Sequence, residues 1–292
     1  MSATQQQLDQ QNSAFWNELC GSNDAKKLGI TDSSKESLAK FDAWYLGFYP
    51  YLLPTVQPER MQGKKVLEIG LGYGTLGQQI AQAGADYTGM DLSRNPVDHM
   101  GYRLRLHSLP GRTIQGSALA MPFPDQTFDF LVSIGCMHHT GNLQQCFDET
   151  FRVLKPGGIA VIMIYNKYSY MRWRLAPIAT LIESMRGLFG RAKPVSIESA
   201  QHRSRYDQNT DGEAAPEVAL TSVGEVKEML RSFASVSCTK RNADQLAPKG
   251  IKLIPRSWMA PTVGRLLGLD IYIEARKGVA CAAVPAAAAA AA

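Results

Sequence analysis

Segments typical of β-strands alternate with segments of helical spacing through residues 64–166. The strand-like runs are short, apolar and bounded by glycine or polar residues, whereas apolar residues recur every three or four positions in the helix-like segments. Strands joined through helices in this way form parallel sheets with right-handed crossovers, so the pattern predicts an α/β fold. The predicted strands cover 64–70, 85–91, 112–118, 128–135 and 159–166, and the predicted helices cover 75–84, 96–109 and 142–154.

The alternation stops after Asn166 and resumes near the C-terminus. Helix-like stretches and a long polar loop fill the interval, and a helix followed by two strand-like runs completes the core. We predict five parts: an N-terminal helical lid over 1–60, a cofactor-binding core over 61–166, an inserted cap over 167–219, the C-terminal part of the core sheet over 220–278, and a low-complexity alanine-rich tail over 279–292.

Composition narrows the class of protein. The 292 residues are 45% apolar and 20% charged, as in soluble globular proteins, and the net charge of +5 comes from interleaved bases and acids rather than a basic run. Nucleic acid is therefore not an expected partner. The five cysteines are scattered without zinc-type spacing, which predicts no metal site and a reduced, cytoplasmic location. No signal peptide or membrane-spanning run is visible, so no membrane partner is expected.

A glycine-rich turn follows the first predicted strand. Gly70, Gly72, Gly74 and Gly77 stand where a strand passes into a helix, and glycine there lets the backbone approach a ligand closely. The last three form a GxGxxG pattern, and Asp91 follows at the offset of an acid that binds ribose hydroxyls. This pattern alone also fits a dinucleotide-binding protein, so a nicotinamide-dependent oxidoreductase stays open.

Further motifs accompany the glycine turn. Glu68 precedes Gly70 by two residues, where a dinucleotide-binding strand is normally apolar, and its carboxylate is placed to order the turn and face a cationic ligand group. The segment 116–132, the pair His138-His139 and the turn 152–158 follow in order. With these five motifs the chain resembles the class I S-adenosylmethionine-dependent methyltransferases, in particular the branch of ubiquinone-type and other small-molecule enzymes.

The resemblance implies a Rossmann-like, doubly wound, seven-stranded sheet with an antiparallel last strand, and S-adenosylmethionine as the cofactor. Ser117 stands where the family commonly has Asp, so its contact with the adenine amino group is expected to be weaker. The glycine turn would line the methionine part, and an acid at the end of the second strand would bind both ribose hydroxyls. The implied cofactor-binding residues are Glu68, Gly70, Gly72, Gly74, Asp91, Leu92, Ser117, Ala118 and Ser133.

Candidate residues for the methyl acceptor lie in four places: the loop after the fourth strand, the end of the fifth strand, the aromatic stretch 41–51 and the polar loop 201–217. His138 and His139 follow the fourth strand beside the expected methyl group, where either would act as a base or orient the acceptor, or simply shape the loop. Side chains at the end of the fifth strand face substrate in such sheets or pack under the inserted helices. The full set is His138, His139 and Tyr165 as catalytic candidates, and Tyr45, Tyr49, Asn166, Tyr168 and Tyr206 as substrate-binding candidates.

The sequence therefore predicts an enzyme that transfers a methyl group to a small-molecule acceptor. The acceptor atom, O, N, S or C, is left open, as are the need for a general base and the oligomeric state. Two alternatives stay open beside it: the NAD-dependent oxidoreductase, which shares the glycine turn, and a protein that binds S-adenosylmethionine without catalysis.

Overall fold

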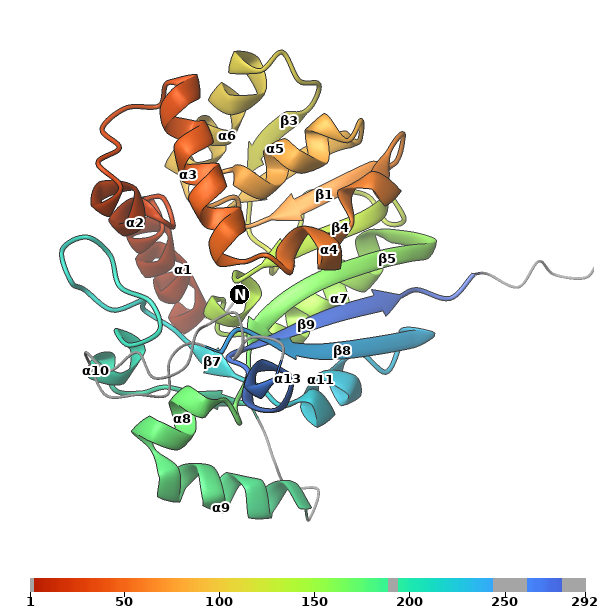
Figure 1. The fold of residues 1–292 in the computed structure, drawn as a ribbon. Coiled ribbons are helices and arrows are strands. Elements are labelled where there is room, and N and C mark those ends of the chain that lie inside the picture. The colour runs from red at the N-terminus through yellow and green to blue at the C-terminus, as the bar shows by residue number, and fades with distance from the viewer. Residues whose placement is uncertain (1–2, 189–193, 244–261, 280–292) are drawn as a thin grey trace, which may run out of the picture.

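A seven-stranded sheet lies at the centre of the computed structural model, which describes residues 3–188, 194–243 and 262–279 (Figure 1). The strand order is β3-β2-β1-β4-β5-β9-β8, and β9 runs antiparallel to both of its neighbours while β1 to β5 run parallel. The predicted α/β sheet with an antiparallel last strand is confirmed. The strands are β1 Lys65–Ile69, β2 Asp86–Asp91, β3 Arg112–Gln115, β4 Phe128–Ile134, β5 Leu154–Tyr165, β8 Ser235–Arg241 and β9 Asp270–Arg276.

Helices cover both faces of the sheet and bury a separate core on each. On one face α5 (Thr75–Gln82) and α6 (Arg94–Leu106) pack on β1, β2 and β4 through residues such as Ile80 and Met100. On the other face α7 (Leu143–Val153) and α11 (Val223–Met229) pack on β4, β5 and β9 through residues such as Phe147 and Leu230. Two buried faces explain why the predicted strands are continuously apolar rather than alternating.

Several element boundaries differ from the sequence prediction by a few residues, and two of the differences have a clear local cause. Helix α6 begins at Arg94 rather than at Pro96, because Ser93 is the extended residue before the helix. Strand β5 begins at Leu154, directly after α7, so the Lys-Pro-Gly-Gly turn belongs to the strand. Leu154 pairs there with Phe128, and the register of β4 with β5 shifts at a bulge before Phe130.

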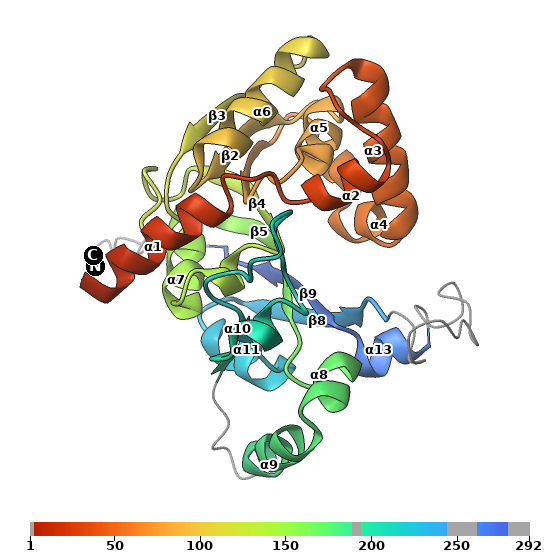
Figure 2. The same ribbon diagram turned by 90° about the vertical axis from the view of Figure 1, so that its left-hand side faces the viewer.

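The N-terminal segment is helical and borders the edge of the sheet where β1 ends (Figures 1 and 2). Its helix α3 packs beside α5 and α6, while α1 crosses towards the inserted segment. The elements are α1 Ala3–Phe15, α2 Ser22–Lys27, α3 Lys35–Phe48, α4 Leu52–Val56 and the 3-10 helix η1 Pro58–Met61.

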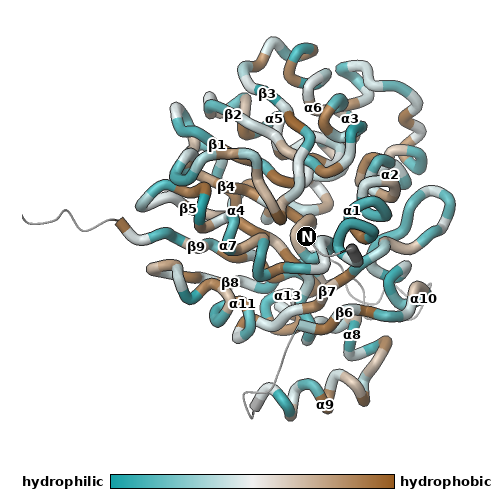
Figure 3. Tube along the Cα trace, turned by 180° about the vertical axis from the view of Figure 1, so that it is seen from behind, coloured by the Kyte–Doolittle hydropathy of each residue, from teal (hydrophilic) through white to brown (hydrophobic). Residues whose placement is uncertain are grey.

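The inserted segment leaves the sheet after β5 and returns to the same point. Thr221 N–H donates to the carbonyl of Tyr165 at 3.1 Å, and Lys167 N–H donates to the carbonyl of Thr221 at 2.9 Å. Helix α9 lies at the margin of the molecule, where brown and teal alternate along its tube (Figure 3). The elements are α8 Tyr170–Leu175, α9 Pro177–Leu188, α10 Ala200–Arg203 and the two-stranded sheet of β6 Val195–Ser196 with β7 Ala219–Leu220.

Helix α13 (Val263–Leu267) precedes β9 and packs beside β8. Among the residues that the structure describes, no helix has both the length and the apolar character needed to cross a bilayer. The predicted tail lies, from residue 280 onward, outside the described residues.

Candidate functional site

A cavity of about 420 Å³ lies at the C-terminal ends of the parallel strands. Residues at the ends of β1 to β5 and in the loops that follow line it, and residues of the N-terminal and inserted segments complete the lining. The strand order reverses between β1 and β4, and ligands of open α/β sheets bind at this kind of reversal. The topology therefore selects this cavity as the candidate site.

The glycine turn forms one wall of the cavity. Glycine is needed there because the backbone passes too close to neighbouring residues to carry a side chain. Gly70 has φ of +82°, and a Cβ there would lie 2.5 Å from the Cβ of Cys136 in the loop after β4. Gly74 has φ of +79° and begins α5, and its Cβ would lie 2.7 Å from Cδ of Arg103. Gly72 lies between them in the same wall.

Glu68 lies at the base of the glycine turn with its carboxylate buried. The carboxylate accepts a short hydrogen bond from the hydroxyl of Tyr87 on β2, and burial raises the pKa of Glu68 to about 8. A Cβ on Gly77 would come within 2.4 Å of both of these oxygens, so glycine is needed for α5 to pack this close to the strands. Glu68 therefore ties β1, β2 and α5 together beneath the cavity that it also lines.

Asp91 ends β2 beside the glycine turn and lines the cavity. Its Oδ2 accepts a hydrogen bond from the Leu71 amide at 2.9 Å, and its Oδ1 accepts one from the Ser93 amide at 2.9 Å. Burial raises the pKa of Asp91 to about 6, and these amides oppose the shift. The carboxylate is thus mostly ionised at neutral pH and fixed by backbone on both sides. The cofactor-binding candidates Leu92, Ser117 and Ala118 line the cavity near it.

Helix α3 brings aromatic side chains to the cavity and is fastened to the glycine turn. Asp42 on α3 forms a buried ion pair with Arg103 of α6 and also accepts a hydrogen bond from Thr75 Oγ1 at 2.6 Å. Arg103 in turn donates to the carbonyl of Tyr73 within the turn at 2.8 Å. The substrate-binding candidates Tyr45 and Tyr49 lie in the resulting wall.

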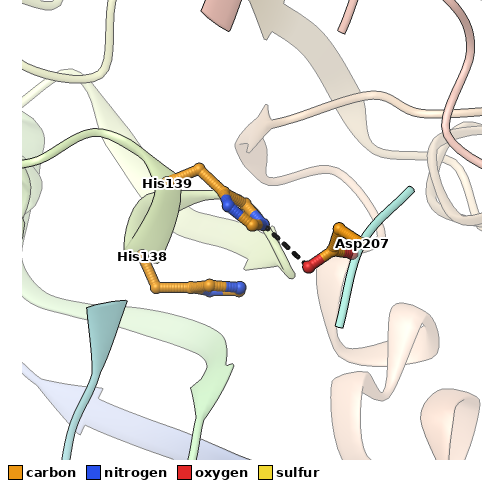
Figure 4. Close-up of side chains that lie close together, drawn as sticks. All are labelled: His138, His139 and Asp207. Carbon is orange, nitrogen blue, oxygen red and sulfur yellow. Dashed lines mark ion pairs between the residues drawn. The ribbon is translucent and has the colours of Figure 1, made fainter. Parts of the chain in front are cut away.

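A polar cluster stands at the end of the cavity formed by the loops after β4 and β5. His139 Nδ1 donates to the carbonyl of Glu217 at 2.5 Å, so in the neutral ring Nε2 carries no proton. That Nε2 lies 3.7 Å from Oδ2 of Asp207 (Figure 4). The hydroxyl of Tyr165 donates to Oδ1 of Asp207 at 3.1 Å. Burial raises the pKa of the Asp207 carboxyl, an effect that His139 and Tyr165 oppose.

Aromatic and polar groups of the N-terminal segment close over this cluster. The Trp16 ring packs on the His139 ring with centroids 4.8 Å apart, and Asn12 Nδ2 donates to the carbonyl of His139 at 2.7 Å. Tyr206 packs against Tyr165 with ring centroids 5.5 Å apart. His139, Tyr165 and Tyr206 were expected near the acceptor from the sequence, and the structure brings them together at one wall of the cavity.

Two residues assigned to the site from the sequence are instead buried beneath it. Ser133 is fully buried in β4, and its side chain does not reach the cavity, which the next residues of the loop line instead. His138 is also fully buried, under the ring of His139, and burial lowers its pKa well below the usual range. Neither residue therefore lines the cavity itself.

Two further candidates support the inserted segment rather than the cavity. The Asn166 side chain donates to the carbonyl of Gly268 at 2.7 Å and accepts from the Tyr168 amide at 3.1 Å. The Tyr168 hydroxyl donates to the carbonyl of Glu183 on α9 at 3.1 Å. The chain turns away from the sheet after Tyr165, so these side chains pack under the inserted helices, as the alternative interpretation of the sequence held.

Sequence reasoning missed several residues of the site. Trp16 lies in a polar N-terminal stretch, where the adjacent aromatic residues Phe15 and Trp16 are the only local sign of a buried contact. Asp207 was noted only as part of a long polar loop, and Asp270 and Tyr272 only as part of a strand, although all three line the cavity. Nothing local in the sequence marks them, because their position depends on how distant segments meet.

Residues 67–162 match the family described as "Methyltransferase domain". The chain is 31% identical over 132 residues to a demethylmenaquinone methyltransferase of Tropheryma whipplei, an alignment that covers 42% of this chain and 54% of the relative. It is 30% identical over 204 residues to a sterol methyltransferase-like protein of Botryococcus braunii, covering 67% and 52%. The chain thus spans about half the length of these curated relatives.

The fold agrees with these sequence matches. A crystal structure of a SAM-dependent methyltransferase from Methanosarcina mazei superposes with a TM-score of 0.53 at 16% identity, covering 78% of this chain and 98% of that one. The matched core, the strand order and the antiparallel β9 together define a Rossmann-like methyltransferase fold. Residues 67–162 thus match a methyltransferase domain within this fold, in line with the motifs of the sequence.

Proposed function

We propose that the protein is an enzyme that transfers a methyl group from S-adenosylmethionine to a small-molecule acceptor. The observation that carries this proposal is the cavity itself, in which the backbone-held carboxylate of Asp91 and the glycine turn form one end and the polar cluster around His139 forms the other. One end thus fits a nucleoside with an amino-acid tail, and the other leaves room for a second molecule.

The residues of the first end fit the cofactor. We assign the ribose hydroxyls to Asp91, the adenine to Leu92, Ser117 and Ala118, and the methionine part to the glycine turn with Glu68. The volume of about 420 Å³ falls within the range of ligand pockets. When bound, S-adenosylmethionine supplies a methyl group that is already activated for in-line displacement at its sulfonium. The chain then has to align the acceptor and exclude water.

The acceptor end is lined by aromatic rings with a polar group at its far wall. Trp16, Tyr45, Tyr49 and Tyr272 present apolar surface, while His139 and Tyr165 present polar atoms. We therefore propose an acceptor with an apolar body and one polar reacting group, activated and oriented at His139. The relatives are named as a demethylmenaquinone methyltransferase and a sterol methyltransferase-like protein, and these names support an acceptor of this character and a place in the ubiquinone-type, small-molecule branch.

We further propose that residues 1–60 act as a lid and residues 167–219 as a cap. Contacts between the two segments support this: the Glu18 carboxylate accepts hydrogen bonds from the amide and the hydroxyl of Thr210, and Asn23 Nδ2 donates to the carbonyl of Gln208 at 3.0 Å. We place the protein in the cytoplasm because its described cysteines are all free thiols. Nucleic acid and membrane partners are not part of the proposal.

Calorimetric titration tests the cofactor first. The purified chain is titrated with S-adenosylmethionine, S-adenosylhomocysteine and NADH, and we expect micromolar binding of the first two and none of NADH. Binding of NADH instead would overturn the proposal in favour of the oxidoreductase.

Detection of a product tests catalysis. The chain is incubated with S-adenosylmethionine carrying a ¹³C-labelled methyl group and a fractionated metabolite extract, and products are detected by mass spectrometry. We expect a labelled small molecule that is absent with the Asp91→Ala variant. Cofactor binding without any labelled product across acceptor classes would favour a binding protein instead.

A further inference from the structure

Three side chains that can bind a metal ion meet at the acceptor end of the cavity. His138 and His139 are adjacent in the 3-10 helix η2 (Met137–His139) after β4, and Asp207 comes from the inserted segment after α10. One nitrogen or oxygen of each lies within 4.8 Å of the others, and all three side chains point to a common region (Figure 4). The fold thus brings two imidazoles and a carboxylate to one place.

Several polar atoms of these three side chains lack hydrogen-bond partners in the part of the chain that the structure describes. Within residues 3–188, 194–243 and 262–279, no hydrogen-bond partner exists for either ring nitrogen of His138, for Nε2 of His139 or for Oδ2 of Asp207, and all of these atoms are buried. Buried polar atoms are normally paired, and a group of them left unpaired calls for a bound species. The rings of His138 and His139 pack against each other with centroids 4.2 Å apart, and no hydrogen bond joins their nitrogens.

For His139 and Asp207, the polar atom that faces away from this region is held by a hydrogen bond, as is usual for metal ligands. The Nδ1–H of His139 donates to the backbone carbonyl of Glu217, which leaves Nε2 as the atom with a free lone pair. The Tyr165 hydroxyl donates to Oδ1 of Asp207 and so directs Oδ2 towards His139. Outer hydrogen bonds of this kind fix the orientation and tautomer of metal-binding side chains.

We propose that His138, His139 and Asp207 bind one divalent transition-metal ion. Two imidazoles and one carboxylate suit zinc, iron or cobalt rather than magnesium or calcium, which prefer oxygen ligands alone. Bonds of about 2.0–2.2 Å would bring the three ligand atoms to roughly 3–3.5 Å from one another, so the site has to close by about 1 Å from the separations found here.

The position of this ion bears on the acceptor, an inference that rests on the proposed function. His139 and Asp207 line the cavity, whereas His138 lies beneath it, so the remaining coordination positions face the cavity. A three-ligand site of this type keeps a position for water or substrate oxygen. The ion would therefore hold an oxygen of the acceptor, which selects hydroxylated acceptors over those that offer only a thioether or a carbon.

A cobalt titration tests the site without relying on activity. The full chain is stripped with a chelator and titrated with Co²⁺, followed by its visible absorption, and Zn²⁺ binding is measured by competition. We expect one Co²⁺ per chain, displaced by Zn²⁺ but not by excess Mg²⁺. His139→Ala and Asp207→Ala should each weaken Co²⁺ binding at least about 100-fold, and Tyr165→Phe about tenfold, since outer partners contribute to affinity.

Controls separate loss of the site from loss of the fold. His202→Ala removes an exposed histidine of α10 and should leave Co²⁺ affinity unchanged. If the alanine variants do not fold, as judged by circular dichroism, His139→Gln and Asp207→Asn replace them with side chains of similar size. Absence of stoichiometric Co²⁺ binding, or equal binding by the His139 and Asp207 variants, overturns the metal site.

S-adenosylhomocysteine binding, measured on the same stripped chain, distinguishes the two proposals. Its binding without Co²⁺ binding would reject the metal site and leave the proposed cofactor intact. Co²⁺ binding without S-adenosylhomocysteine binding would do the reverse.

Discussion

The carboxylate of Asp42, on helix α3, forms an ion pair with the guanidinium of Arg103, on helix α6, and Arg103 is fully buried. The same guanidinium donates to the carbonyl of Tyr73 in the glycine turn, and Asp42 accepts a hydrogen bond from Thr75 at the start of α5. One buried charge pair therefore connects the N-terminal helices with the wall of the cavity that faces the cofactor. The N-terminal segment is thus tied to the cavity that it helps to line.

Substitution of Asp42 tests this connection. Asp42→Ala leaves the Arg103 charge buried without a carboxylate, and loss of one partner of such a pair costs about 3–5 kcal/mol of unfolding free energy. Chemical denaturation measures this loss. Asp98→Ala serves as the matched control, because it removes an ion pair with Arg94 that is exposed to solvent and should leave stability nearly unchanged. Equal stability of the two variants would refute the structural role of the buried pair.

Asp91→Ala should weaken binding of S-adenosylhomocysteine by about 10- to 100-fold, since hydrogen bonds from ligand hydroxyls to a charged group are among the stronger ones. Calorimetry gives the dissociation constants. Asp86→Ala, at the exposed start of the same strand β2, is the control and should bind as tightly as the wild type. An unchanged affinity in Asp91→Ala would remove Asp91 from the cofactor site.

Glu68 predicts a pH dependence of folding stability. Its pKa in the folded protein, about 8, lies above the ordinary value of 4.5. The folded protein therefore keeps this proton to higher pH than the unfolded chain does, and stability falls as pH rises from 4.5 to 8. Glu68→Gln abolishes the titration, so its unfolding free energy should decline less than that of the wild type over this range.

Denaturation at a series of pH values checks this expectation. The difference between wild type and Glu68→Gln isolates Glu68, because Asp91 titrates in both proteins. Glu36→Gln, at an exposed position of α3, is the control and should follow the wild type. Parallel curves for wild type and Glu68→Gln would show that Glu68 ionises normally in the folded protein.

The contact between the proposed lid and cap gives a kinetic prediction. Glu18→Ala removes the hydrogen bonds to the amide and hydroxyl of Thr210 without touching the floor of the cavity. We expect S-adenosylhomocysteine to dissociate several-fold faster, with little change in thermal stability, because exposed hydrogen bonds contribute little to folding. Stopped-flow displacement measures the rate. If Glu18→Ala and the exposed control Glu36→Ala release the ligand at the wild-type rate, the two segments do not act as a cover.

Much of the fold was predictable because its signals are local. Alternating apolar runs predict the strands, and the antiparallel last strand followed from the family resemblance. The glycines of the turn are needed wherever φ is positive or a Cβ would collide, as at Gly70 and Gly74. The acid Asp91 stands at the end of its strand, so its place at the mouth of the sheet follows from strand position alone. These features depend on backbone geometry within a few residues of each position.

The acceptor end depends on tertiary structure instead. The 3-10 turn and the packing of Trp16 decide whether His138 or His139 faces the cavity. Asn166 and Tyr168 lie away from the cavity because the chain leaves the sheet after Tyr165. Asp207 reaches His139 only because the inserted segment folds back over the sheet. The sequence by itself determined the class of fold and the cofactor end of the cavity. Packing between segments distant in the chain decided the acceptor end, because no local pattern encodes which side chains such segments bring together.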